Sequence, residues 1–310
     1  MGAAYDASMR GALALLVLLP FAAFAGDELT PLSDEFNDAS TLANWKRVYA
    51  VEGWPANQLE QQDINGTIPG KMRMMPFTST WYNDYRGELT FKEVQGDLVV
   101  TTDVTSTQRN GAGAPSSLYS LAGILVRNPR QITPATWQPG RENYIFLALG
   151  AANAARTFQY EVKTTVNGIS TIVVSSAAGN HAVIQVARLG PHVITLRNDG
   201  TGWVVHRRYY RPDFASIMQV GMTVYTDFPF CFNNYTPFAH NSTVIHGGNA
   251  DLVGAFDYFR FERPAIPAAL ADAAFSDANA VTDAQLLSFL GANATANTTP
   301  ATSRRRASRH

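Results

Sequence analysis

The stretch from Phe158 to Val174, FQYEVKTTVNGISTIVV, decides the fold class of this chain. Its first nine residues alternate, so that Tyr160 and Val162 fall on one side of an extended segment while Glu161 and Lys163 fall on the other. Asn and Gly at 167–168 accept positive φ, which is typical of a two-residue hairpin turn. The stretch therefore predicts two antiparallel strands with one apolar and one polar face.

Similar short runs of β-branched and aromatic residues recur along the chain and are closed by turn residues, which indicates an antiparallel sandwich. The predicted strands are 98–104, 123–127, 144–149, 184–189, 192–197, 203–209, 218–226 and 255–262. The segment 52–85 lacks a sustained period and is predicted to form long loops across one face. The fold class expected is all-β, an antiparallel jelly-roll β-sandwich.

Composition narrows the class of protein. Apolar residues make up 46% of the 310 residues and charged residues only 16%, with a formal net charge of −1. A nearly neutral chain lacks the basic face that nucleic acid requires, so nucleic acid is not an expected partner. The single cysteine, Cys231, lies among phenylalanines and is interpreted as a small buried apolar residue.

The N-terminal segment predicts export, and the C-terminal segment predicts a short helix joined to the domain by a linker. Residues 12–25, ALALLVLLPFAAFA, are too short to span a bilayer and end in a small-x-small site, so 1–25 is interpreted as a signal peptide. No later run is long enough for a transmembrane segment, and the expected location is secreted, periplasmic or at the cell envelope. The domain expected is 26–264, followed by a linker (265–280), a short helix outside the sandwich (281–291) and a disordered tail (292–310).

Six short strings and one tryptophan, taken in order, carry a family resemblance. They are DEF at 34–36 with Trp45, GDLVV at 96–100, AGILVR at 122–127, ITLRNDG at 194–200, VGMTVY at 220–225 and AFDYF at 255–259. In this order they resemble the concanavalin A-like lectin/glucanase superfamily, especially bacterial laminin-G-like modules and the carboxy-terminal modules of some β-xylosidases. The resemblance implies the sandwich, but the fold hosts lectins, hydrolases, lyases and inert modules.

The same resemblance implies a structural calcium where the first and last strands meet. It points to Asp34 and Asp257 as metal ligands, with backbone carbonyls completing the oxygen shell. The alternative is that Asp34 caps a turn and Asp257 is a surface residue of a strand.

The segment Thr80 to Arg86, TWYNDYR, contains the residue types that bind sugars: aromatic rings, a carboxylate, an amide and a guanidinium. Aromatic faces pack against pyranose rings and polar groups bind the hydroxyls. The predicted ligand-binding residues are Trp54, Trp81, Tyr82, Asp84, Tyr85, Arg86 and Arg127. The alternative is that these rings pack over the edges of the core. The leading hypothesis is an exported, non-catalytic module that binds a polysaccharide or glycan.

Two further hypotheses stay open. The first is a glycoside hydrolase or lyase. The chain lacks the Glu-x-Asp-x-x-Glu string of the glucanases, and the acids that come nearest to such a pair are Glu60 and Asp63. Residues 206–211, HRRYYR, contain the tyrosine, histidine and arginine side chains that a lyase uses. The other is an envelope scaffold that binds a protein partner through the C-terminal helix.

Overall fold

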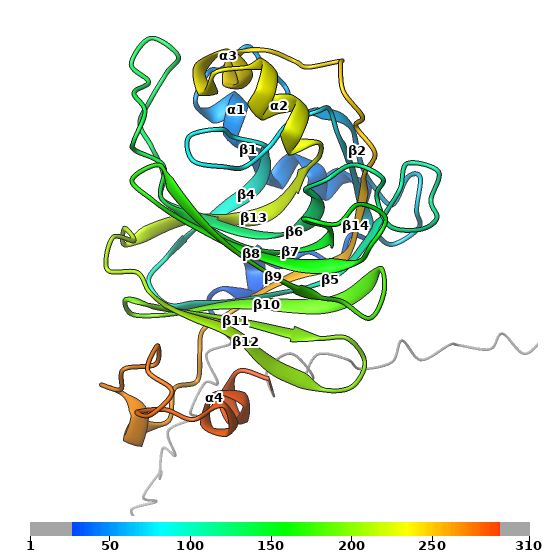
Figure 1. Cartoon of the computed structure of the whole chain (residues 1–310). Coiled ribbons are helices and arrows are strands. Elements are labelled where there is room, and N and C mark those ends of the chain that lie inside the picture. Colours follow the sequence, from blue (N-terminus) through cyan, green and yellow to red (C-terminus); the bar gives the residue numbers. More distant parts are fainter. Residues whose placement is uncertain (1–26, 292–310) are drawn as a thin grey trace, which may run out of the picture.

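The computed structural model of the protein describes residues 27–291. The predicted signal peptide and the predicted disordered tail lie outside the described residues. Two seven-stranded antiparallel sheets stack face to face, which confirms the predicted sandwich (Figure 1). None of the helices within 27–291 is long and apolar enough to cross a membrane.

The sheet that lies uppermost in Figure 1, called the upper sheet, supports the loop that contains Thr80 to Arg86. In spatial order it contains β1 (Lys46–Arg47), β4 (Glu88–Gln95), β13 (Ile217–Tyr225), β6 (Ser120–Arg127), β7 (Tyr144–Ala151), β8 (Gln159–Val166) and β9 (Ile169–Ser176). The hairpin of β8 and β9 pairs Val166 with Ile169 across Asn167 and Gly168, both at positive φ. The turn predicted from the Asn-Gly pair is confirmed.

The lower sheet completes the sandwich. In spatial order it contains β12 (Trp203–Tyr210), β11 (His192–Asn198), β10 (His181–Leu189), β5 (Leu98–Thr107), β14 (Val253–Glu262), β3 (Met72–Pro76) and β2 (Leu59–Ile64). The last two strands lie inside the segment that was predicted to be all loop. Alternation failed to reveal β2 because its pairing with β3 shifts register between Leu59 and Gln61, which interrupts the period of two.

The main core fills the space between the sheets. Inward side chains such as Val100, Ile124, Leu147 and Val162 are fully buried there and come from strands of both sheets. Tyr160 and Val162, on the apolar side of β8, belong to this core, as the alternation predicts. Glu161 and Lys163 therefore point away from the core, toward the outer face of the upper sheet.

Loops and short helices cover that outer face. They are α1 (Val48–Val51), α2 (Phe228–Asn234) and α3 (Pro237–Ser242), which lie above the upper sheet in Figure 1, together with the loops at 52–58 and 77–87. A second apolar cluster, including Trp54, Trp81 and Phe146, is buried beneath them. We call these loops and helices the upper cover.

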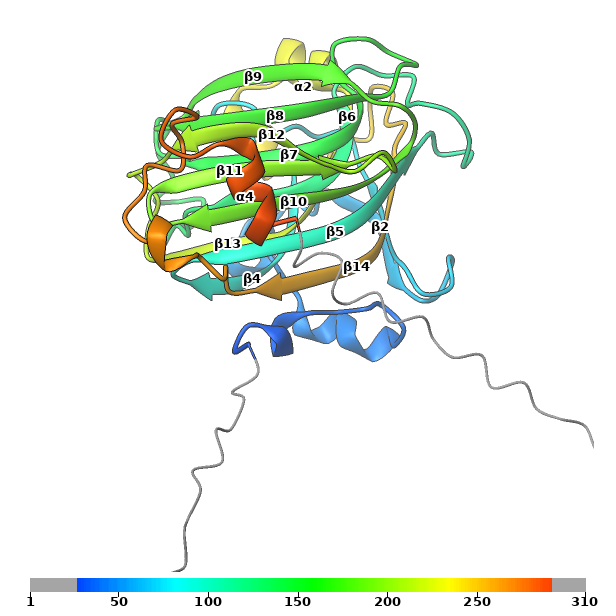
Figure 2. The same ribbon diagram turned by 90° about the horizontal axis from the view of Figure 1, so that it is seen from below.

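The C-terminal segment covers the outer face of the lower sheet. The helix α4 (Asp283–Phe289) lies across β10, β11 and β12 (Figure 2). Together with Ile266, Leu270 and Phe275, it forms a third apolar cluster against Ala187, Leu196 and other residues of that sheet. We call residues 266–290 the lower cover. The short helix predicted outside the two sheets is present, and both it and the preceding residues, interpreted as a linker, pack on the lower sheet.

Within residues 27–291, three short 3₁₀ helices lie outside the sheets. The 3₁₀ helices η1 (Thr30–Leu32) and η2 (Ala39–Asn44) precede β1, and η3 (Ala268–Leu270) belongs to the lower cover.

Candidate functional site

The loop at 80–86 crosses the outer face of the upper sheet, where the predicted ligand-binding residues do come together. Most of them are buried. Trp81, Arg86 and Arg127 have no exposed surface, and Trp54, Asp84 and Tyr85 retain very little. Tyr82 is the exception, because its half-buried side chain lines a cavity.

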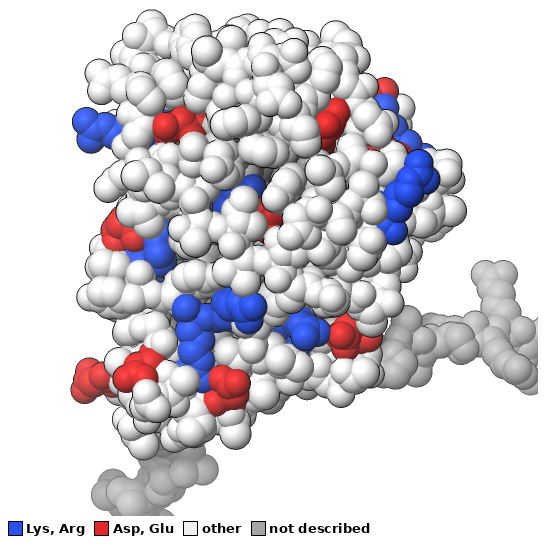
Figure 3. Space-filling view, in the orientation of Figure 1, with Lys and Arg blue, Asp and Glu red and all other residues white. Residues whose placement is uncertain are grey.

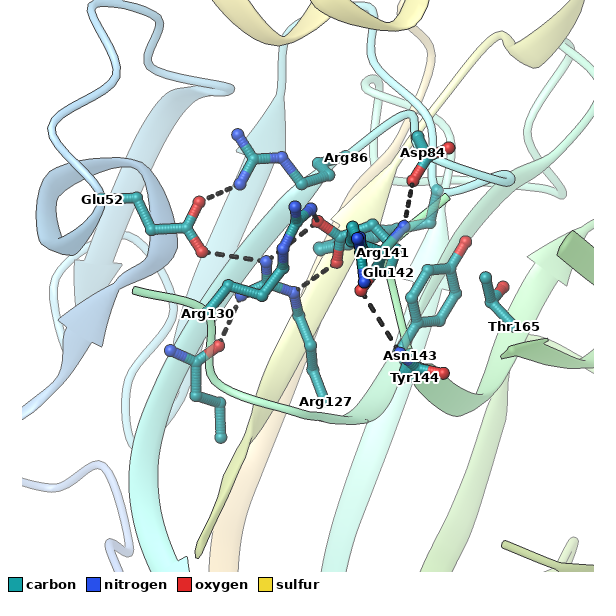
Figure 4. A network of polar contacts seen from close by, with 12 residues as sticks. Glu52, Asp84, Arg86, Arg127, Arg130, Arg141, Glu142, Asn143, Tyr144 and Thr165 are labelled. Atoms are coloured by element: carbon teal, nitrogen blue, oxygen red, sulfur yellow. Dashed lines mark hydrogen bonds and ion pairs between the residues drawn. The ribbon is translucent and has the colours of Figure 1, made fainter. Parts of the chain in front are cut away.

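A buried ionic network occupies the centre of the upper cover (Figure 4). Arg127, at the end of β6, binds Glu142 through two bonds of 2.7 and 3.1 Å and lies 2.9 Å from Glu52. Arg86 also pairs with Glu52, and Arg130 lies 2.6 Å from Glu142. Burial alone would raise the pKa of Glu142, but the guanidinium of Arg127 lowers it to about 2.

The remaining polar groups of this segment bind the protein itself. Asp84 accepts a bond of 2.7 Å from the amide of Gly140, and the Trp81 indole donates to the carbonyl of Glu88 at 3.1 Å. The Tyr85 hydroxyl donates to the carbonyl of Tyr235 at 2.6 Å. These groups hold the loops of the upper cover on the sheet.

Beside this network, a small pocket opens into the upper cover. It has a volume of about 140 Å³ and is lined by Tyr82, Tyr119, Lys163, Ile172 and Phe228. Lys163 comes from β8, Ile172 from β9, and Phe228 begins α2. We call this cavity the Tyr82 pocket. It combines three aromatic rings with one ammonium group.

Lys163 is almost completely buried, with a side chain 1% exposed. Its Nζ lies 2.9 Å from Oε1 of Glu161 and donates to the carbonyl of Trp81. Ring centroids of Phe146 and Tyr225 lie 5.0 and 5.3 Å from Nζ, within the range of a cation–π contact. Burial lowers the pKa of Lys163, while the charge of Glu161 opposes that shift.

Two buried polar groups behind Lys163 have unused hydrogen-bonding capacity. No well-aligned hydrogen bond joins either carboxylate oxygen of Glu161 or the hydroxyl of Tyr225 to a described residue, although Oε1 of Glu161 lies 2.9 Å from Lys163 Nζ and the Tyr225 hydroxyl is near enough to Glu161 to interact with it. Burial, reinforced by the charge of Glu161, raises the pKa of Tyr225 well above its usual range. Such unpaired buried groups are costly, and each one calls for a physical account.

The predicted acids of the hydrolase hypothesis lie on β2, in the lower sheet. Glu60 is 2.6 Å from Arg109, whereas Asp63 accepts bonds of 2.7 and 2.8 Å from the amide and hydroxyl of Thr67. Each carboxylate thus has its own partner, and Asp63 serves to hold the turn that follows β2.

The predicted lyase segment forms β12, and its histidine faces the interior. Arg197 Nε lies 3.2 Å from Nδ1 of His206, so this nitrogen accepts and the proton of the neutral ring resides on Nε2. Burial, with help from Arg207 and Arg197, lowers the pKa of His206 to about 4. Arg211 is buried and donates to the carbonyls of Tyr144 and Thr165.

Asp34 and Asp257, the predicted calcium ligands, are engaged differently from each other. Both oxygens of Asp34 accept hydrogen bonds of 2.9 Å, one from the amide of Phe36 and one from the Trp45 indole. Asp257 is half exposed and lies 3.8 Å from Lys71. Within 27–291 no group of three or more His, Cys, Asp or Glu side chains is arranged to hold a metal. Calcium binding by Asp34 and Asp257 with backbone carbonyls stays a prediction.

The buried Cys231 in α2 is also outside any reactive setting. Burial, followed by the charge of Asp227, raises the pKa of its thiol. A protonated, enclosed thiol is a poor nucleophile.

Comparison with known proteins finds similarity in structure alone. No protein-family model matches the chain, and no curated protein is similar in sequence. The GH43 BlXynB protein from Bacillus licheniformis is 13% identical with a TM-score of 0.50, and the match covers 76% of this chain and 40% of that one. The carbohydrate-binding module CBM66 from Bacillus subtilis is 12% identical with a TM-score of 0.39, over 70% and 94% of the two chains.

A basic winged bean lectin, solved with Tn-antigen, is also similar, at 12% identity and a TM-score of 0.39 over 67% of this chain and 93% of that one. At such identities a likeness shows fold alone. The chain spans less than half of the GH43 protein. Its own sheets make the protein an antiparallel β-sandwich, and the likeness to the GH43 protein agrees with that fold.

Proposed function

We propose that this protein binds carbohydrate without cleaving it, and that the Tyr82 pocket is the binding site. One observation carries the proposal: three aromatic rings and a lysine N–H donor surround a single small cavity on the outer face of the upper sheet. Pyranose rings have apolar C–H faces that pack on aromatic rings, and their hydroxyls need precisely placed polar partners.

The carboxylates around this face favour binding over hydrolysis. Glycosidases need two carboxyl groups, about 5–5.5 Å apart for retention or about 6.5–9.5 Å for inversion. None of the five residues that line the Tyr82 pocket is an acid. Glu161 is paired with Lys163, while Glu52 and Glu142 are held by arginines.

The proposal keeps Tyr82 from the residues predicted by sequence and adds Tyr119, Lys163 and Phe228. It assigns Trp54, Trp81 and Arg127 to holding the upper cover in place. We further propose that the protein works outside the cytoplasm, which rests on the signal-peptide pattern at 1–25.

The test is glycan binding by the full chain and by two single variants. Tyr119→Ala removes a ring from the pocket, whereas Tyr210→Ala removes a ring that is 62% exposed on β12 of the lower sheet. We expect retention on at least one polysaccharide, a loss of affinity of about tenfold or more for Tyr119→Ala, and no change for Tyr210→Ala.

Chromatography of the bound glycan completes this experiment. Intact glycan after prolonged incubation supports a binding protein, and shortened products would establish the hydrolase or lyase alternative. Unchanged affinity of Tyr119→Ala would show that the Tyr82 pocket is not the site.

A further inference from the structure

Resting on the proposed function, we infer that the Tyr82 pocket takes the end of an uncharged sugar chain and that the ammonium of Lys163, neutralised by Glu161, donates a hydrogen bond to a hydroxyl of that terminal residue. The inference concerns the class of ligand. It combines the charge, the free hydrogen-bonding capacity and the size of the pocket.

The charge balance disfavours an acidic sugar. Lys163 is the only charged residue that lines the pocket, and its ammonium lies 2.9 Å from the carboxylate of Glu161. An anionic ligand would therefore meet a neutral pair instead of a free cation, and it would lose its hydration without a compensating charge. Charged side chains are also sparse on the surface over α2 and α3 (Figure 3). A neutral sugar avoids this desolvation cost.

The hydrogen-bond inventory fits a ligand hydroxyl that accepts. The ammonium of Lys163 has three N–H donors, of which one goes to the Trp81 carbonyl and one to the nearby carboxylate of Glu161. The third has no hydrogen-bond partner among the described residues. A hydroxyl in the pocket that accepts from this N–H would complete the hydrogen bonding of Lys163, whereas Glu161 is fully buried and does not line the pocket.

The size limits the ligand to a chain end. A volume of about 140 Å³ is well below the roughly 300–1,000 Å³ of pockets that enclose drug-sized molecules. Two of the lining rings, Tyr82 and Phe228, contact each other edge to face with centroids 5.0 Å apart. One sugar ring, or part of one, is the largest unit that such a cavity encloses.

The first test compares ligands on the full chain. Neutral probes are the hexasaccharides of cellulose, xylan, laminarin and mannan, and anionic probes are oligogalacturonate, alginate hexamers and chondroitin sulfate. We expect binding to one or more neutral probes, unchanged within about twofold between 50 and 500 mM NaCl, and binding to anionic probes at least tenfold weaker.

Chain length gives a second readout from the same titrations. For the preferred sugar, the disaccharide, tetrasaccharide and hexasaccharide should bind within about threefold of one another, because only the terminal residue enters. Preference for an anionic probe, or affinity that rises more than tenfold with length, would overturn the inference but leave carbohydrate binding in place. Failure of every probe to bind would instead refute the proposed function and the inference together.

The second test removes the pair itself. The double variant Lys163→Met, Glu161→Gln eliminates both charges at once, so neither remains buried without its partner. We expect binding to the preferred neutral probe to fall at least tenfold, with an unchanged circular dichroism spectrum. The matched control, Lys46→Met with Glu93→Gln, removes an exposed pair of 2.7 Å between β1 and β4 of the same sheet and should bind normally.

Should the double variant fail to fold, Ile172→Trp provides the alternative. Ile172 is partly exposed and lines the pocket from the edge strand β9. The indole of a tryptophan at this position would fill the cavity and leave the Lys163–Glu161 pair intact. Full affinity in either folded variant would overturn the inference.

Discussion

The two outer faces of the sandwich are both covered, but by opposite chemistry. The upper cover buries charged side chains, with Arg127 bound to Glu52 and Glu142 and with Lys163 bound to Glu161. The lower cover buries an apolar cluster, in which α4 and the segment before it pack on β10 and β11. Among the described residues its one ion pair joins Arg208, whose side chain is 9% exposed, to Asp283, whose side chain is 61% exposed.

The difference affects how firmly each cover is fixed, not whether cavities occur, because the Tyr82 pocket lies under the upper cover and another pocket is lined by Ile266, Ala271 and Phe275 of the lower cover. Apolar side chains can shift and fill space, because their contacts have no direction. Buried charges fix both partners in place, since an unpaired charge in the interior costs several kcal/mol. The upper cover is thus held in one arrangement, and that arrangement leaves the Tyr82 pocket open.

The strongest test of the comparison removes a charge from the upper cover. Arg127→Met leaves Glu52 and Glu142 without their shared guanidinium, so we expect the free energy of unfolding to fall by about 3–5 kcal/mol. Urea denaturation at pH 7 measures it. Lys46→Met, at an exposed pair, should cost at most about 1 kcal/mol. A loss below about 1 kcal/mol for Arg127→Met would show that the network is dispensable.

Acid should also weaken the upper cover. His240, in α3, is fully buried, accepts from the amide of Thr80 at 3.2 Å and has a pKa lowered to about 4, chiefly by burial. The unfolded chain, with a histidine pKa of about 6.5, binds more protons between these values, so stability falls as pH drops through that window. From pH 7.5 to 4.5 we expect a loss of about 2–3 kcal/mol from this residue.

Unfolding of the wild type and of His240→Gln at several pH values isolates this contribution. The variant should be less stable at pH 7.5 but should show a shallower fall toward pH 4.5. An equal slope in the two proteins would mean that His240 does not cause the loss. His206, also with a pKa lowered to about 4, contributes in the same direction in both proteins and therefore cancels.

A smaller effect is expected from the lower cover. Leu286→Ala deletes a fully buried side chain of α4 from the third apolar cluster, and we expect a loss of about 2 kcal/mol, at the low end for such substitutions because the site is peripheral. Ala284→Ser, at an exposed position of the same helix, should change stability by less than about 0.5 kcal/mol. Equal stability of both variants would indicate that α4 does not stay docked in solution.

The smallest effect concerns the start of α4. Thr282 caps this helix by accepting from the amide of Gln285, whose side chain accepts in return from the amide of Thr282. Thr282→Ala should cost about 1 kcal/mol, and Thr282→Ser only a few tenths. Thermal unfolding of the two variants side by side measures the difference. A larger effect than that of Leu286→Ala would reverse our ranking of the forces that hold the lower cover.

Several features of the fold were predictable because they depend on neighbours in sequence. The alternation in β8 and the Asn-Gly turn each involve residues within a few positions of one another. The strands β2 and β3 were missed because their hydrogen bonds and a register shift, not a period of two, define them. The helices α2 and α3 were missed because they are short and contain proline and aromatic residues.

The site was harder to predict than the fold. The segment Thr80 to Arg86 has the composition of a sugar-binding loop, but composition does not say which side chains face solvent. Arg86 can be buried because it pairs with Glu52, which lies 34 positions earlier in the chain. Arg127 can be buried because it pairs with Glu142, which comes from a separate loop. Such partners become visible only when the loops are placed on the sheet.

Lys163 shows most clearly which features follow from sequence and which follow from tertiary structure. The sequence by itself determined that Glu161 and Lys163 lie together on the face of β8 opposite the core, because side chains alternate along any strand. Only the tertiary structure decided that this face is covered, since the loop at 80–86 and the start of α2 come from distant parts of the chain. That covering turns an ordinary surface pair into a buried one beneath aromatic rings, where hydrogen bonds and charge interactions are stronger than in water.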